Sequence, residues 1–202
     1  MDRRRKVILM YDIEKSTECI IRQLYNKGAM DKAALSALRS SSRLDGNRAQ
    51  KVWPVFLSNL NEKYLSKTGK ATRAEMAVFV AVRMYALHQQ SSDYCVFARK
   101  RYSSADVTGV ENGLELFEVL NQLSKVEESR VALERHVQAL LGTTNFTAAV
   151  DQLIHLMQIV KGKKLGIRID YARLAGDLYR FQLGYRQANE VRLHWGEQYY
   201  RA

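Results

Sequence analysis

The amino-acid sequence predicts an all-α protein built as two small helical-bundle domains. Apolar residues recur along nearly the whole chain at spacings of three and four positions, the period of a helix with one buried face. This pattern lapses between Ser91 and Gly113, where turn-forming residues gather. We therefore predict an N-terminal basic helical domain over residues 1–105 and a C-terminal helical domain over residues 106–202. The 202 residues, 47% of them hydrophobic, suffice for two cores of roughly 100 residues each.

The first half contains three clear helix predictions. Gly28 is expected to end the first helix, because glycine readily adopts the left-handed conformation found after a helix. The only proline, Pro54, marks the start or a kink of the second. Thr72 and Glu75 have capping-box spacing and open a third helix through Leu87, which is apolar on almost every face and should be the buried centre of the first domain. The stripes of the first two helices are Ile13, Thr17, Ile20, Ile21 and Leu24, and then Trp53, Phe56, Leu57, Leu60 and Tyr64.

The second half repeats this pattern with five apolar stripes. Ser124 and Glu127 repeat the capping-box spacing, so we expect them to open a helix that ends at Gly142. The next stripe stops at Gly162, and Asp170 can cap the helix that follows. The stripes, in chain order, are Leu114, Phe117, Leu120 and Leu123; Leu133, Val137, Leu140 and Leu141; Phe146, Val150, Leu153, Ile154, Met157 and Val160; Leu174, Leu178, Phe181 and Tyr185; and Val191, Trp195 and Tyr199.

The net charge of +11 is confined to the first half of the chain. Residues 1–105 carry 20 Lys and Arg against 9 Asp and Glu, whereas residues 106–202 carry 12 of each kind. A positive field of this size favours a polyanionic partner, because each neutralised phosphate releases a condensed counterion. The charge distribution therefore predicts nucleic-acid binding that begins in the N-terminal domain, the alternative being a solvated basic surface.

The sequence lacks recognisable motifs for catalysis, metal binding or secretion. Cys19 and Cys95 lie far apart, which excludes a disulfide framework or a zinc ribbon and suits a reducing cytoplasm. The four histidines are scattered one per helix, and no Gly-x-Ser-x-Gly elbow or Walker motif occurs. Only five apolar residues, Val7 to Tyr11, follow the basic N-terminus, too few for a signal-peptide core or a membrane span. We expect a cytoplasmic, non-enzymatic protein without catalytic residues, metal, cofactor or membrane contact.

Several basic clusters are candidates for phosphate contacts. Arg39 and Arg43 are four apart, as on one helical face. Lys70 precedes a predicted helix N-terminus, where unpaired N–H groups favour an anion. Arg99, Lys100 and Arg101 form a basic run in the interdomain segment. Any one of these clusters could equally be solvated surface.

The order of short motifs over residues 30–200 resembles the CasB family, the small subunit of the type I-E CRISPR Cascade complex. The motifs that carry the resemblance are Ala34-Leu35-Ser36-Ala37-Leu38-Arg39; Glu75 through Ala86-Leu87-His88-Gln89-Gln90; Gly113-Leu114; Glu128-Ser129-Arg130 with Leu140-Leu141; Val150 to Val160 with Lys161; and Asp170 through Asp177-Leu178 to Val191, Trp195 and Tyr199-Tyr200.

This resemblance implies a specific role in antiviral defense. It implies a small subunit that forms a homodimer within a crRNA-guided complex, contacts the other Cascade subunits and the crRNA, and holds the displaced strand of the target DNA. Such contacts matter because R-loop formation is a nearly balanced exchange of duplexes. The expected phosphate contacts are Arg39, Arg43, Lys70, Arg73, Arg130, Lys161, Lys163 and Lys164. The alternatives are a helical duplex-DNA-binding transcriptional regulator and a protein-only scaffold whose charge serves solubility.

Overall fold

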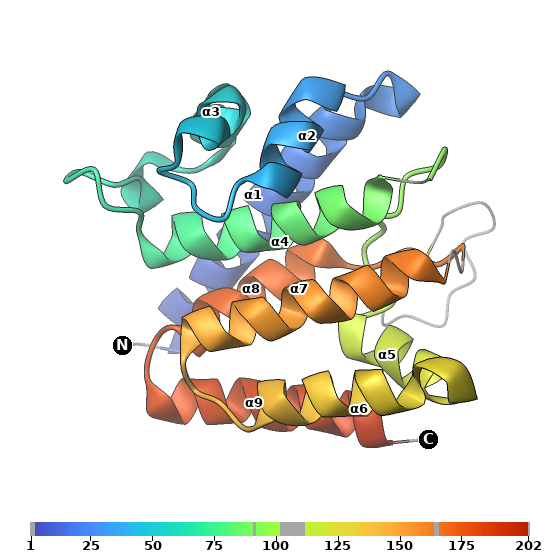
Figure 1. Ribbon diagram of the computed structural model, residues 1–202. Coiled ribbons are helices and arrows are strands. Elements are labelled where there is room, and N and C mark those ends of the chain that lie inside the picture. Colours follow the sequence, from blue (N-terminus) through green and yellow to red (C-terminus); the bar gives the residue numbers. More distant parts are fainter. Residues whose placement is uncertain (1–2, 91, 102–111, 164–165, 202) are drawn as a thin grey trace.

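A computed structural model describes residues 3–90, 92–101, 112–163 and 166–201, and most of these are helical (Figure 1). The α-helices are α1 (Arg3–Tyr25), α2 (Lys32–Ser40), α3 (Trp53–Asn59), α4 (Arg73–Gln89), α5 (Leu116–Ser124), α6 (Glu127–Leu141), α7 (Phe146–Gly162), α8 (Tyr171–Phe181) and α9 (Tyr185–Tyr200). Short 3-10 turns are η1 (Asn26–Gly28), η2 (Asn47–Val52) and η3 (Glu62–Tyr64). These ranges contain no β-strand, only backbone bridges that join Ile169 to Phe97 and Leu114. The all-α prediction is confirmed.

Most helix boundaries follow the predicted capping residues. Gly28 lies just past the end of α1 with φ of +99°, the left-handed region that favours glycine. Pro54 occupies the first turn of α3, where its missing N–H costs nothing. The side chain of Asp170 accepts a hydrogen bond from the Arg173 N–H at the start of α8, at 2.9 Å.

The predicted capping box at Ser124 is wrong. Ser124 is the last residue of α5, and its hydroxyl donates to the carbonyl of Asn121 at 2.7 Å. The hydroxyl is therefore engaged by the preceding turn, and α6 begins after Val126 with no side-chain cap. A glutamate caps α5 instead: the Glu118 carboxylate accepts from the Glu115 N–H at 2.9 Å.

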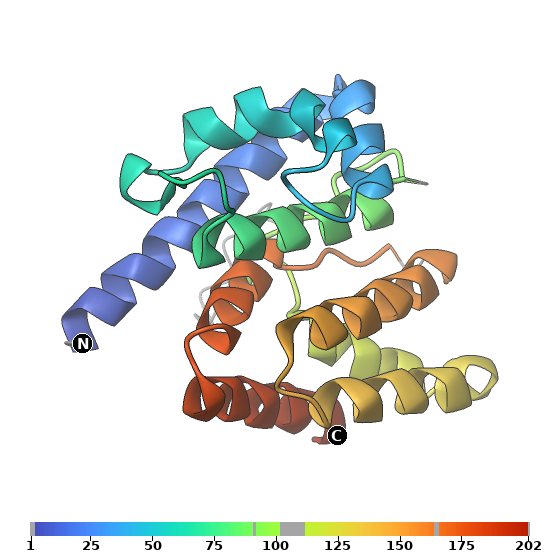
Figure 2. The ribbon, with the colours of Figure 1, turned by 60° about the vertical axis from the view of Figure 1, so that its left-hand side comes forward.

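α4 is the central helix of the described structure. It packs against α1, α2, α7 and α8, and both views show it between α2 and α3 on one side and α7 on the other (Figures 1 and 2). The predicted Thr72–Glu75 capping box opens it. Most of its residues are buried, as the sequence predicted for a helix that is apolar nearly all round.

α8 connects the two halves of the chain. It packs against both α1 and α4, and the fully buried Tyr171 at its start places its hydroxyl 2.8 Å from His88 Nδ1 in α4. One contiguous cluster of buried residues receives side chains from helices before and after the predicted boundary. The boundary itself, between residues 105 and 106, lies outside the described residues, and the division into two domains stays a prediction.

None of the helices, as far as the chain is described, is long and apolar enough to cross a membrane.

Candidate nucleic-acid interface

α4 separates four of the predicted phosphate-binding residues into two groups. Lys70 and Arg73 lie at its N-terminal end, and both side chains are exposed. Arg39 of α2 and Lys161 of α7 lie against its last turn. Because an α-helix rises 1.5 Å per residue, the 17 residues of α4 set the two groups about 25 Å apart.

The N-terminus of α4 is already occupied by a carboxylate of its own. Glu75 is buried, and its carboxylate accepts from the Thr72 N–H at 2.6 Å and from the Ser66 N–H at 3.0 Å. A second negative charge close to this carboxylate would be repelled. A phosphate at this end therefore has to be held by the exposed side chains of Lys70 and Arg73, and not by the helix terminus.

The other end of α4 gathers two cations, one of which binds a carbonyl of its last turn. The Arg39 Nη1 donates to the carbonyl of Ala86 at 3.5 Å, and the Lys161 Nζ donates to Gln90 Oε1 at 2.7 Å. Carbonyls in the last turn of a helix carry partial negative charge, so cations there are favourable. Burial lowers the pKa of Arg39 from its ordinary value, although an arginine stays charged at neutral pH. Both cations are thus fixed at one place beside α2, α4 and α7.

Two further predicted residues form ion pairs with glutamates of α6. The Lys163 Nζ lies 3.2 Å from Glu128 Oε2, and the Arg130 Nε lies 3.5 Å from Glu134 Oε1. The Glu128 side chain is 86% exposed, so the pair is easily exchanged for another anion. Lys164 lies outside the described residues.

Arg43 does not share a helical face with Arg39, contrary to the prediction. α2 ends at Ser40, and Ser41 is already extended, so the four-residue spacing no longer aligns the two side chains. The Arg43 guanidinium instead binds Asp45 through two hydrogen bonds of 2.8 and 2.6 Å.

Arg83 is a cation of α4 that the predicted set omits. Its side chain is partly buried, and its Nε is buried without a hydrogen-bond partner. Burial lowers the pKa of Arg83, and the nearby Asp151 of α7 acts in the opposite direction. Arg83 is the one charged residue between Met76 and Leu87, and an isolated charge gives no periodic signal for a binding residue, which is why the sequence pattern does not identify it.

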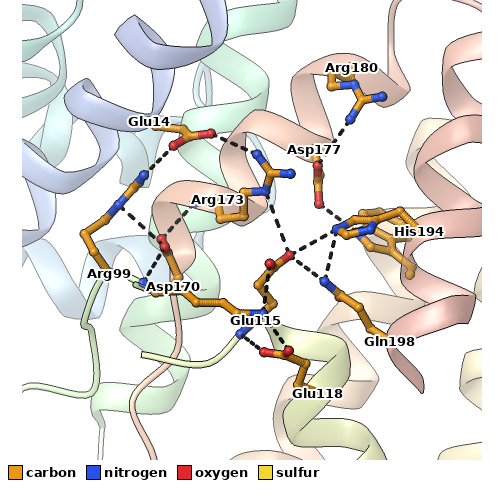
Figure 3. Close-up of polar contacts among 12 residues, drawn as sticks. Glu14, Arg99, Glu115, Glu118, Asp170, Arg173, Asp177, Arg180, His194 and Gln198 are labelled. Carbon is orange, nitrogen blue, oxygen red and sulfur yellow. Dashed lines mark hydrogen bonds and ion pairs between the residues drawn. The ribbon is translucent and has the colours of Figure 1, made fainter. Parts of the chain in front are cut away.

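Arg99 and Lys100 of the basic run bind carboxylates of the protein itself, and Figure 3 shows Arg99 pointing to Glu14 and Asp170. The Arg99 guanidinium binds Glu14 of α1 and lies 3.5 Å from Asp170, while the Lys100 Nζ lies 2.5 Å from Glu118. Burial lowers the pKa of Arg99, but the carboxylates outweigh that effect and the net shift is upward. These two cations therefore stabilise the protein itself, which removes them from the predicted nucleic-acid surface.

The same network continues to α9. Glu115 accepts from Gln198 Nε2 at 2.6 Å, and His194 Nε2 lies 3.2 Å from the same carboxylate oxygen. The hydrogen bond to Glu115 raises the pKa of His194. Asp177 of α8 accepts from the buried Trp195 Nε1 at 3.0 Å, which joins α8 to α9.

Glu115, Asp177 and His194 are also the described residues closest to a metal-ligand geometry. Their ligand atoms lie within 4.8 Å of one another. However, Lys100 Nζ lies 3.3 Å and Arg173 Nε 3.8 Å from the Glu115 carboxylate. These cations already neutralise the carboxylate that a divalent ion would need, so the arrangement is that of a structural ion-pair network.

Comparison with known proteins agrees with the fold and the order of these elements. The family model described as CRISPR-associated protein Cse2 matches residues 34–200. Among solved structures, the chain is similar to the crystal structure of CasB from Thermobifida fusca, with a TM-score of 0.65 and 21% sequence identity over 95% of this chain and 97% of that one. A comparison with curated proteins gave no match. The resemblance to the CasB family is confirmed, and the chain belongs to the family of CRISPR-associated protein Cse2.

Proposed function

We propose that this protein is a non-catalytic, nucleic-acid-binding small subunit of the Cascade complex that stabilises the R-loop by holding the displaced strand of the target DNA. The observation that carries the proposal is the family match over residues 34–200. Membership in this family supports a place in a CRISPR surveillance complex, beside the other Cascade subunits. Three further points are part of the proposal: the chain holds the displaced strand, contacts the crRNA, and forms a homodimer within the complex.

The distribution of cations supports binding to a phosphate backbone. The basic excess belongs to residues 1–105, and cations lie at both ends of α4: Lys70 and Arg73 at one, Arg39 and Lys161 at the other. Backbone contacts carry affinity without sequence preference. This suits a subunit whose complex reads sequence by guide pairing, since a few salt contacts can tip a balanced R-loop.

A comparison of two targets tests this role. Cascade is reconstituted with and without this chain, and its affinity is measured for a duplex target and for the target strand alone. We expect the chain to tighten binding to the duplex and to leave binding to the single target strand unchanged, because only the duplex yields a displaced strand. An equal gain on both targets would contradict strand holding, and no gain on either would contradict a role in the R-loop.

Nucleic-acid binding by the isolated protein distinguishes the proposed function from that of a duplex-binding regulator. The proposal predicts that the isolated chain binds a single strand at least as well as a duplex, with little sequence preference and a steep loss on adding salt. A sharp preference for one palindromic duplex would favour the regulator.

A further inference from the structure

α4 presents an interrupted line of accessible residues along an otherwise buried helix, with the buried Phe79 and Val80 between Met76 and Arg83. The residues of this line are Arg73, Met76, Arg83, Leu87 and Gln90, which follows the last helical residue. Their spacings of three, four or seven residues place them on one face of the helix. We name this line the α4 stripe. The helix that carries it, α4, lies between α2 and α3 on one side and α7 on the other, as both ribbon views show (Figures 1 and 2).

Cations lie at both ends and near the middle of the α4 stripe. Lys70 and Arg73 stand at the start, and Lys161 binds Gln90 at the end. Arg83 follows Arg73 by ten residues, which is about 15 Å along the helix, and precedes Gln90 by about 10 Å. One further positive charge therefore lies between the two end groups.

Arg83 has a binding capacity that the protein does not use. Its Nε is buried without a hydrogen-bond partner, and the guanidinium keeps its charge despite this loss of water. Because the Nε is enclosed, a phosphate would bind at the two terminal nitrogens of the guanidinium, whose charge is only partly solvated and whose fork matches phosphate oxygens. Met76 and Leu87, on either side of Arg83 along the stripe, offer apolar contacts to sugars and bases.

We propose that the α4 stripe is a track for the phosphate backbone of a single nucleic-acid strand, and that Arg83 is its central contact. The track joins the two separate groups of cations into one path of about 25 Å, or about seven phosphates at the 3.4 Å spacing of a stacked strand. This inference rests on the proposed function and specifies where the strand lies. The inference also assigns a role to Asp151, the exposed carboxylate of α7 whose negative charge is felt by Arg83. This charge repels the phosphates and limits the affinity for the strand.

Matched substitutions in the full chain test the track. The probe is a fluorescein-labelled oligothymidylate of 12 nucleotides, followed by fluorescence anisotropy as a function of salt. Arg83→Gln should weaken binding about fivefold and reduce the slope of log K against log salt by about 0.7, the value for one lost phosphate contact on a single strand. Asp151→Asn should strengthen binding, because it removes a negative charge beside the track.

The control removes the same charge elsewhere. Arg135 is exposed on α6, which lies on the far side of α7 from α4 in both views. Arg135→Gln should leave the salt slope unchanged, and circular dichroism should show that every variant keeps its helical content. Equal effects of Arg83→Gln and Arg135→Gln would overturn the track, as would unchanged binding by both Arg83→Gln and Asp151→Asn.

The outcomes also separate the track from the proposed function. Tight binding of the oligonucleotide by the wild-type chain with no dependence on Arg83 would reject the track alone. Binding that depends on Arg83, but with no gain in duplex affinity when the chain joins Cascade, would reject the R-loop role and leave the track standing. A wild-type chain that does not bind the oligonucleotide even at low salt would contradict both.

Discussion

His88 Nδ1 and the Tyr171 hydroxyl lie 2.8 Å apart, and this contact joins the central helix α4 to α8 across 83 positions of sequence. Both side chains are buried, and Tyr171 is completely enclosed. Burial lowers the pKa of His88 to about 4, so the imidazole is neutral in the native protein at neutral pH. A neutral imidazole can share a hydrogen bond with the hydroxyl, whereas a buried imidazolium would be unfavourable.

The depressed pKa of His88 makes stability depend on pH. Between pH 6.5 and 4 the unfolded chain binds a proton at this histidine and the native protein does not, so acidification favours unfolding. We expect this group to remove roughly 3 kcal/mol of stability across that range. Urea unfolding of wild type and His88→Gln at several pH values should show the flatter curve for the variant. Parallel curves would contradict a buried neutral His88.

His194 should act in the opposite direction. Its hydrogen bond with Glu115 raises its pKa above the ordinary value of 6.5, so its stabilising effect is complete below pH 6.5 and is lost as the pH rises through the raised value. The groups that face it are Glu115, Asp177, Arg173 and Gln198. The stability difference between wild type and His194→Gln should therefore be larger at pH 6 than at pH 9. A difference that grows with pH would reject the Glu115 pairing.

A pair of hydroxyl deletions compares the capping box at Thr72 with Ser124, where the predicted box is absent. The Thr72 hydroxyl accepts from the Glu75 N–H at 3.1 Å, so Thr72→Ala should cost about 1 kcal/mol of unfolding free energy. Ser124→Ala removes a hydroxyl that caps no helix N-terminus and should cost less than about 0.5 kcal/mol. Chemical denaturation measures both. If the two costs were equal, the assignment of Ser124 to the end of α5 would be wrong.

The internal role of Arg99 is tested by comparing it with an exposed arginine. Arg99 is two-thirds buried and holds Glu14 and Asp170 together, so Arg99→Met should destabilise the protein by about 2 kcal/mol. Arg22 forms an exposed pair with Glu18, and Arg22→Met should cost less than about 0.5 kcal/mol. The thermal midpoints of the two variants, measured by calorimetry, should differ accordingly. Equal midpoints would indicate that Arg99 behaves as an ordinary surface cation.

Local signals in the sequence predicted most of the helices and several of their ends, but not α2, and the stripes drawn through Tyr64 and Tyr185 extend past the ends of α3 and α8. Pro54, Gly28, the Thr72–Glu75 box and Asp170 act through neighbouring backbone groups, so their spacing alone predicts what they do. Ser124 shows the limit of such signals. Its spacing to Glu127 fits a cap, but the turn before it has already used the hydroxyl.

The candidate site depends on contacts that are distant in sequence, and there the sequence was less informative. Arg99 is bound by Glu14, 85 positions away, and no local pattern reveals that partner. Arg43 lost its alignment with Arg39 because α2 stops at Ser40. Arg83 is a candidate because it stays partly exposed in a buried helix and its Nε has no hydrogen-bond partner, and both features depend on tertiary packing.

Photocrosslinking within the assembled R-loop tests strand holding most directly. Cascade containing this chain is bound to a duplex target with 4-thiothymidine at single positions of either strand, and the crosslinked subunit is identified after irradiation. We expect crosslinks to this chain from the displaced strand and not from the target strand, with a lower yield for Arg83→Gln than for Arg135→Gln. Crosslinks from the displaced strand to other subunits only would contradict the proposed function.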